Sequence, residues 1–277
     1  MSTLTFTLLV GLGSFVAGLL GALTGLGGGV VIVPLLTLAF GVDFRYAVGA
    51  SLIAVIATSS GAAAAYVREG FTNVRIGMFL EVATTIGALL GAYLAGLIST
   101  SVLSVVFGLV LLYSAYAAVR PKPEHVVSVR DPIAVRLRLD GSYPGVDGEK
   151  EYHVQRVPLG FGAMLGAGAL SGLLGIGSGA LKVVAMDQAM CLPFKVSTTT
   201  SNFMIGVTAA ASAGVYLARG YIDPGIAMPV MLGVLAGAML GVRVLARTRQ
   251  KVLRIVYALV IAVVAVEMIY NGAAGHI

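Results

Sequence analysis

The chain has 277 residues, of which 58% are hydrophobic and only 11% are charged, and its formal net charge is +6. A soluble domain carries about 25% charged residues, so this chain is too poor in charge to cover a water-facing surface. Several apolar runs reach about 20 residues, the length of a membrane-spanning helix. The composition therefore excludes a soluble globular domain and predicts an all-α polytopic membrane protein.

The apolar stretches form about ten segments, five in each half of the chain. Two of them, 28–41 and 179–192, are too short for a comfortable crossing and directly follow glycine clusters. We expect a non-helical break there, which is tolerated in a membrane only where protein or a water-filled cavity surrounds it. The expected segments are 4–24, 28–41, 46–67, 76–98, 101–119, 158–177, 179–192, 196–218, 226–246 and 252–270.

A polar stretch separates the two groups of segments. It carries seven Lys and Arg residues between positions 120 and 157, so the positive-inside rule predicts that it is cytoplasmic. Alternating residues and a turn signal near Gly141 and Pro144 fit either a small hairpin or a disordered loop. The expected organisation is a first membrane repeat at 1–119, a cytoplasmic linker at 120–157 and a second membrane repeat at 158–277.

The two groups of segments repeat each other 150 residues apart without a gap. Gly25, Gly27 and Gly29 fall on Gly175, Gly177 and Gly179, and Ser51, Thr58 and Tyr66 fall on Ser201, Thr208 and Tyr216. Duplicated, glycine-broken membrane segments are the best sequence pointer to the binding site of a secondary transporter. The loop at 246–251 is rich in Arg and Lys, whereas its counterpart at 97–101 has no charge. Equivalent loops are therefore predicted on opposite sides, as in an inverted repeat with both termini outside.

The glycine clusters also carry a family resemblance. GLGGGVVIVPLL at 25–36 resembles the first-repeat signature of the TauE/SafE sulfite-exporter family, also called TSUP. GIGSGALKVVAM, followed by STTTSNFMIG, resembles the second-repeat signature. The resemblance implies transport of small sulfur-containing oxoanions or organosulfonates, usually outward across the cell membrane. The chain departs from the pattern at Ser178, which replaces the central glycine, and at Val184, which stands where a second proline would be.

The two breaks are candidate anion sites. Backbone N–H groups at a helix N-terminus supply hydrogen-bond donors and a positive dipole end, and glycine lets the backbone approach a ligand closely. The alternative is that these glycines only permit close helix packing. The candidate substrate-binding residues at the breaks are Gly27, Gly28, Gly29, Gly177, Ser178 and Gly179.

Lys182 lies deep in an apolar segment, where a lysine costs about 2.5–3.5 kcal/mol on insertion scales. It could contact an anionic substrate, pair with Asp187, or extend its ammonium to an interface. Asp187 is in turn a candidate coupling or ion-pair residue. Ser201 and Asn202 could donate to an oxoanion without the cost of a full charge, or could bond to nearby backbone instead.

Glu81 and Glu267 lie near predicted segment ends, so we expect them at interfaces, although a buried carboxylate could carry a coupling proton. The chain has no nucleotide-binding loop and no histidine–carboxylate cluster with metal spacing, so neither an enzyme nor a cofactor or metal site is predicted.

The predicted function is a secondary transporter, in the exporting direction usual for the family, that works by alternating access. Its expected partners are a small anionic substrate and the lipid bilayer, without nucleic acid. A coupling proton or sodium ion and an oligomer are left open. The alternatives are an anion channel of the same fold and a non-transporting scaffold whose linker binds a cytoplasmic partner.

Overall fold

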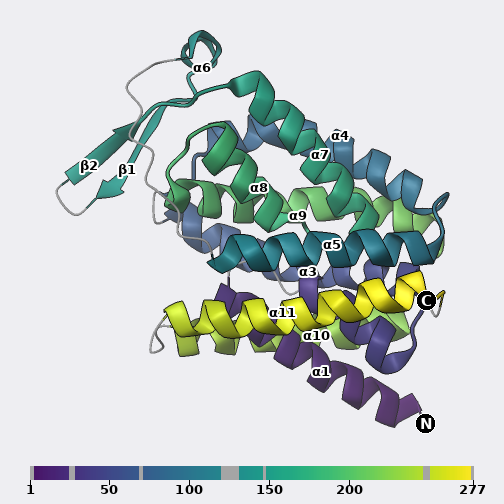
Figure 1. Ribbon diagram of the computed structural model, residues 1–277. Helices are drawn as coiled ribbons and strands as arrows, with labels where there is room; N and C mark the ends of the chain where they lie inside the picture. The colour runs from purple at the N-terminus through teal and green to yellow at the C-terminus, as the bar shows by residue number, and fades with distance from the viewer. Residues whose placement is uncertain are drawn as a thin grey trace.

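A computed structural model of the chain describes residues 3–24, 29–68, 71–119, 131–145, 148–245 and 250–275. It is a bundle of long helices with a small two-stranded hairpin at one end (Figure 1). Within the described ranges, six helices are long and apolar enough to cross a membrane. The all-α polytopic membrane fold predicted from composition is thus confirmed.

The helices of the first half follow the apolar segments of the sequence. Its short segment begins as an α-helix and widens without interruption into a π-helical turn, η1. Apolar side chains such as Ile32, Val33 and Leu36 are buried along both parts. The elements are α1 (Thr3–Thr24), α2 (Gly29–Pro34), η1 (Leu35–Ala39), α3 (Phe44–Arg68), α4 (Val74–Ala95) and α5 (Thr100–Val119).

The second half repeats these elements, and the starts of its short helix, its π-helical turn and the three following helices all lie 150 residues further on. The π-helical turn follows Pro34 in the first half but Val184 in the second. The lost N–H of a proline is therefore not what widens the helix at this point. The elements are α7 (Val157–Leu174), α8 (Gly179–Val184), η2 (Ala185–Ala189), α9 (Phe194–Ala218), α10 (Pro224–Leu245) and α11 (Gln250–Ala273).

The halves exchange their first helices. α1 packs on α10 of the second half, and its counterpart α7 packs on α4 of the first half. Glycines let the backbones touch at both places: a Cβ on Gly87 would lie 2.1 Å from the Leu165 carbonyl oxygen, and one on the equivalent Gly237 would lie 2.0 Å from that of Phe15. Such close approach of small residues is how helices associate in membranes.

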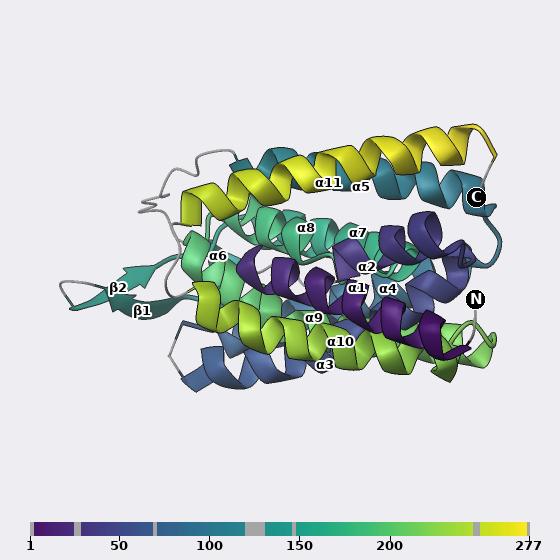
Figure 2. The same cartoon turned by 90° about the horizontal axis from the view of Figure 1, so that it is seen from below.

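α5 and α11 occupy equivalent places in the two halves and lie side by side (Figure 2). The Ser104 hydroxyl donates a hydrogen bond of 2.9 Å to the carbonyl oxygen of Met268. A Cβ on Gly272 would lie 2.9 Å from the carbonyl oxygen of Ser101. The contact that lies later in α5 thus lies earlier in α11, so α5 and its counterpart α11 are antiparallel.

The linker contains a short helix, α6 (Pro132–Arg136), and an antiparallel hairpin of β1 (Gly141–Gly145) and β2 (Gly148–Tyr152). Of the two alternatives for the stretch near Gly141 and Pro144, a hairpin or a disordered loop, the structure has the hairpin. The alternating stretch before Gly141 forms α6 instead, because Asp131 caps the helix by accepting from the Ile133 N–H at 2.8 Å and Pro132 suits its first position. Residues 120–130, which carry part of the predicted positive charge, lie outside the described ranges.

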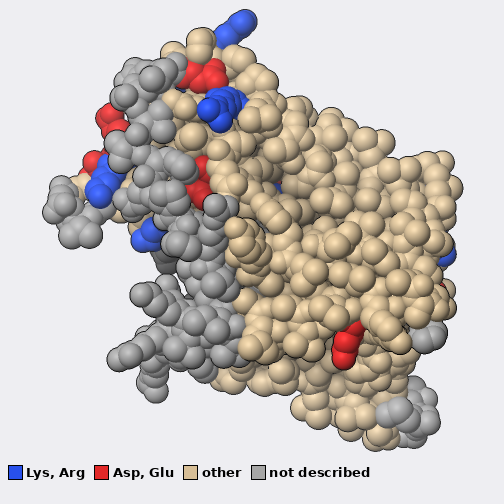
Figure 3. All heavy atoms as spheres, in the orientation of Figure 1, with Lys and Arg blue, Asp and Glu red and all other residues tan. Residues whose placement is uncertain are grey.

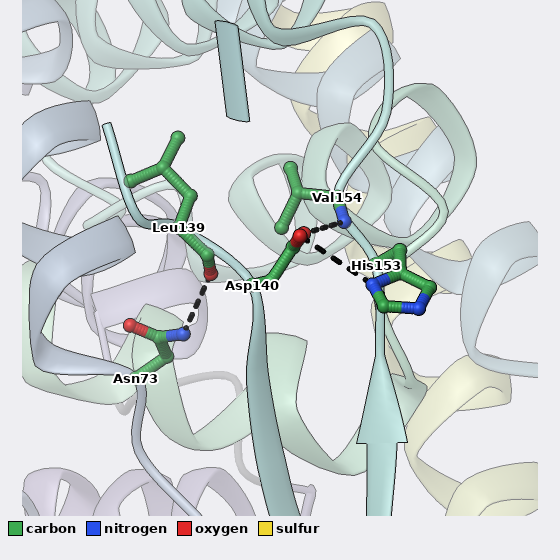
Figure 4. Close-up of polar contacts among 5 residues, drawn as sticks. All are labelled: Asn73, Leu139, Asp140, His153 and Val154. Carbon is green, nitrogen blue, oxygen red and sulfur yellow. Dashed lines mark hydrogen bonds and ion pairs between the residues drawn. The ribbon is translucent and has the colours of Figure 1, made fainter. Parts of the chain in front are cut away.

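Asn73 connects the linker to the bundle (Figure 4). Its Oδ1 accepts from the Ile76 N–H at 3.0 Å and caps α4. Its Nδ2 donates to the Leu139 carbonyl oxygen at 3.1 Å and to the Tyr152 hydroxyl at 2.7 Å, and its own N–H donates to Thr200 Oγ1 at 3.1 Å. Burial raises the pKa of Tyr152 to about 12, so this hydroxyl is neutral at physiological pH. The linker, α4 and α9 therefore meet at one residue.

Asp140 fixes the segment on either side of the hairpin. Its Oδ1 accepts from the Val154 N–H at 2.9 Å, and its Oδ2 lies 3.4 Å from His153 Nδ1 (Figure 4). These contacts tie the two ends of the hairpin together where they join the bundle.

Charge is distributed unevenly along the molecule. On the face shown in Figure 3, most charged side chains lie toward the end that carries α6 and the hairpin, and the rest is almost continuously uncharged. Large apolar side chains such as Met78, Leu109 and Leu259 are more than half exposed in the helices. Both chain ends lie at the end of the bundle opposite the hairpin (Figures 1 and 2). A broad uncharged surface next to a charged end is what we expect of a protein embedded in lipid.

Candidate functional site

The two short segments meet at Ser51, in the middle of α3. Its buried hydroxyl donates to the Gly175 carbonyl oxygen at 2.8 Å and lies 3.4 Å from that of Gly29. A Cβ on Gly29 would lie 2.8 Å from Ser51 Oγ and 3.1 Å from the Gly175 oxygen. Only a glycine leaves room for this approach, so the broken ends of both halves converge inside the protein.

The second break is a tight left-handed turn. Gly175 and Gly177 both have a φ of +67°, and Ser178 has a φ of +47°, which costs a residue with a Cβ more than it costs glycine. Ser178 is 2% exposed, and its hydroxyl has no hydrogen-bond partner among the described residues. A buried hydroxyl without a partner is costly, so it is available for a ligand that reaches the break.

Ser201 holds the second break from the side of α9. Its hydroxyl donates to the Gly179 carbonyl oxygen at 3.1 Å, in the way that its repeat counterpart Ser51 bonds to Gly29 and Gly175. This bond joins α9 to the start of α8, so the Ser201 hydroxyl does not bond to the preceding turn of its own helix. Gly27 and Gly28 lie outside the described ranges, so Gly29 alone represents the first break here.

Asn202 is next to Ser201 and is 9% exposed. In the part of the chain that the structure describes, its side-chain amide makes no hydrogen bond. A mostly buried amide without a partner can donate to a bound oxoanion and costs no buried charge.

Lys182 lies one helical turn beyond Ser178 and is 0% exposed. Its ammonium donates to the hydroxyl of Thr208 in α9. The Thr208 hydroxyl in turn donates to Glu81 Oε1 at 2.7 Å. The ammonium therefore points into the protein, which excludes its extension to an interface.

Glu81 is the carboxylate of this network. Thr85 also approaches its Oε1, at 3.3 Å, whereas Oε2 is buried and accepts no hydrogen bond from any described residue. Glu81 as a residue is half-buried. The linker packs beside it, because Leu80 lies in one cluster with Leu139 and Tyr152. The expected interfacial position of Glu81 stays a prediction.

Asp187 is 3% exposed in η2 and has interactions of its own. The Glu81 carboxylate contacts the Lys182–Thr208 network, and the pairing of Lys182 with Asp187 stays a prediction.

The polar cluster formed by Lys182, Thr208 and Glu81 has no equivalent among the corresponding residues of the other half. The residues 150 positions away from Lys182, Glu81 and Thr208 are Ile32, Met231 and Thr58. Ile32 is fully buried, and the Thr58 hydroxyl bonds back to its own helix at the Ala54 carbonyl oxygen, 3.1 Å away. Of the two equivalent positions, one where α4 and α8 lie beside α9 and the other at the counterpart helices α10, α2 and α3, only the first carries the charged pair among the described residues.

A pocket of about 360 Å³ lies on another face of α8. Apolar side chains such as Leu170, Leu181 and Val184 line most of it. It offers few donors to an anion, so the candidate site is the cluster at the breaks.

Sequence reasoning considered Glu81 as a proton carrier but missed its link to Lys182, and it missed the roles of Thr208 and Ser51. A usable signal existed for the link between Glu81 and Lys182. Glu81 is a charged residue in an apolar segment whose repeat counterpart, Met231, is apolar, which is the same asymmetry that singles out Lys182 against Ile32. The hydroxyls of Thr208 and Ser51 are kept in both halves of the duplication and gave no such contrast.

Comparison with known proteins agrees with this architecture. The family model for the sulfite exporter TauE/SafE matches residues 10–268. The chain is 27% identical to the probable membrane transporter protein YunE of Bacillus subtilis, over 97% of this chain and 99% of that protein. It is 25% identical to the probable membrane transporter protein MJ0441 of Methanocaldococcus jannaschii, over 92% of each chain. No solved structure matches the chain significantly.

The match spans all the described membrane helices except the ends of α1 and α11, and the matched relatives are named as membrane transporters. The six apolar helices agree with a multi-pass protein of the cell membrane. The chain therefore belongs to the TauE/SafE sulfite exporter family.

Proposed function

We propose that the protein is a secondary transporter that exports a small sulfur-containing oxoanion or organosulfonate. The observation that carries the proposal is the fully buried Lys182, one helical turn beyond Ser178 of the second break. A buried ammonium in a membrane is retained for function or paired, and here it bonds through a hydroxyl that an entering anion could replace.

The site would take the anion at the second break. The Ser178 hydroxyl and the Asn202 amide supply donors without partners, and Lys182 supplies the charge. Ser201 and Ser51 shape the breaks through their carbonyl bonds. Gly27, Gly28 and Gly29 would bring the first break to the same anion, with Gly177 and Gly179 opposite.

An inverted repeat would give this site access from both sides in turn. Its support is the antiparallel contact between α5 and its counterpart α11, together with the exchange of α1 and α7 between the halves. On this proposal all ten apolar segments lie in the membrane, with α2–η1 and α8–η2 as the short ones. Because α1 packs on α10 and α7 packs on α4, each body that would rock about the site takes its first helix from the other half of the sequence.

The burial of Lys182 favours a transporter over an anion channel of the same fold. A channel needs a continuous wet path past its binding site, whereas Lys182 is 0% exposed. An anion can reach it only after a conformational change, as alternating access requires.

The test is transport by the purified protein in liposomes, with sulfite, thiosulfate, sulfate, sulfoacetate and acetate as probes. We expect saturable transport of at least one sulfur anion by the parent and its loss in Lys182→Gln. Lys195→Gln is the matched control, because Lys195 lies at the start of α9, 3.6 Å from the centre of the Phe71 ring and away from the cluster. Absence of transport for every anion, in folded protein, would contradict the proposal and favour the scaffold alternative.

A further inference from the structure

The described charges near the cluster balance one another. Lys182 and Glu81 share the Thr208 hydroxyl, so the pair is close to neutral as a unit. α7, which packs on α4, has no charged residue. The other titratable groups on the elements around Glu81 are Arg75 and Tyr93 in α4, Asp187 in η2, Lys195 and Tyr216 in α9, and Asp140, Tyr143 and Tyr152 in the linker that packs beside α4.

Binding of an anion breaks this balance. An oxoanion that takes the Lys182 ammonium leaves the Glu81 carboxylate as a second negative charge in the same buried space. Leaving a charge buried without its partner is strongly unfavourable. A proton on Glu81 removes that charge, so anion and proton favour each other's binding.

The geometry of Glu81 leaves one oxygen open for this proton. Oε1 is held by the Thr208 and Thr85 hydroxyls. Oε2 is buried and accepts no hydrogen bond from any described residue. Protonation of Oε2 therefore breaks none of the hydrogen bonds that hold the side chain.

A sodium ion fits this position less well. It would have to share the Thr208 hydroxyl with the Lys182 ammonium, and the two cations would repel each other at short range. The proton has no such conflict, because it converts the carboxylate into a neutral acid.

We propose that Glu81 is the proton-coupling site of this transporter, and that one proton taken up on Oε2 crosses the membrane in the same direction as each anion bound at Lys182. The inference rests on the proposed function. No bond other than the O–H bond forms or breaks, and the proton comes from the solution on the side where the anion enters. Glu81 thereby replaces Asp187 as the coupling candidate.

The experiment separates coupling from transport by comparing two modes in the same vesicles. Counterflow exchanges labelled for unlabelled anion without a pH gradient, and it requires only the anion site. Accumulation driven by a pH gradient requires the coupling proton as well. Thiosulfate, sulfate and sulfoacetate are the probes, since sulfite binds a proton itself near neutral pH.

We expect pH-driven accumulation by Glu81→Gln, which mimics the protonated acid, to fall to the level of protein-free vesicles while its counterflow stays measurable. Glu267→Gln is the matched control, because Glu267 is an exposed carboxylate in α11, and it should retain both modes. Counterflow together with full pH-driven accumulation in Glu81→Gln would overturn the coupling inference alone. Lack of counterflow in the parent for every probe would overturn the proposed function and the inference with it.

A sodium gradient supplies the remaining arm. Accumulation in the parent that follows sodium and ignores pH would overturn the inference in favour of a sodium site. A second readout does not depend on gradients: the infrared difference spectrum upon addition of thiosulfate should show a carboxylic-acid band in the parent and in Glu267→Gln. That band should be missing in Glu81→Gln, and its persistence there would place the proton elsewhere.

Discussion

The two glycine breaks of this protein have the same backbone but different side chains around them. Each is followed by a short helix and a π-helical turn, and a serine bonds to carbonyl oxygens of the break. Lys182 and Glu81 lie beside one break, whereas Ile32 and Met231 occupy the same places in the other half of the sequence. The duplicated parts therefore build the break, and the unduplicated side chains decide which of the two carries charge.

The largest effect is expected from replacing Lys182 by its repeat counterpart, isoleucine, while Glu81 is kept. Lys182→Ile should abolish transport and also leave Glu81 buried without its cation, at a cost of about 3–5 kcal/mol. Unfolding of the variant in detergent, followed by temperature or denaturant, measures the second effect. A variant as stable as the parent would show that Glu81 does not depend on Lys182.

The double substitution Lys182→Ile with Glu81→Met sharpens the comparison. It gives both halves of the sequence the same residues at these positions. No buried charge is then left unpaired, so most of the stability should return. Transport should remain absent, since the anion has lost its cation. A double variant with the summed loss of the two single variants would mean that the pair is not energetically coupled.

Gly29→Ala tests the convergence of the breaks at their point of contact. The new methyl group would lie 2.8 Å from Ser51 Oγ and 3.1 Å from the Gly175 oxygen, so the break must move, at a cost of about 1–3 kcal/mol. Transport should fall together with stability. Gly162→Ala in α7 is the control, because its Cβ would meet nothing within 4 Å; an equal effect of both substitutions would argue against a special role for the contact.

The smallest effect is expected for the two serines. Ser51→Ala and Ser201→Ala should each cost about 1 kcal/mol, the usual worth of one buried hydrogen bond. Ser51→Ala should cost more, because Ser51 lies within 3.4 Å of the carbonyl oxygens of both breaks. The reverse order, measured by unfolding in the same detergent, would contradict the view that Ser51 joins the two breaks.

The sequence predicts the repeated architecture well, because its signals are local. Apolar length places the helices, and glycine clusters place the breaks at Gly29 and Gly179, where α2 and α8 begin. Equal spacing in both halves then aligns Ser51 with Ser201 before any contact is known.

The partner of Lys182 was beyond this reasoning. Glu81 is 101 positions before it in the chain, and the two meet only because α4 and α8 both pack beside α9. Position near a segment end predicted solvent or an interface for Glu81. The linker packs beside that position through Leu139 and Tyr152, and nothing in the sequence predicted this contact.

The most direct test of the central claim is equilibrium binding of labelled thiosulfate, sulfate and sulfoacetate to the purified protein in detergent. The account predicts saturable binding of at least one of them by the parent and by Lys195→Gln, and its loss in Lys182→Gln. Equal binding by Lys182→Gln and the parent would contradict it, because the buried ammonium at the converging breaks would then not be what holds the anion.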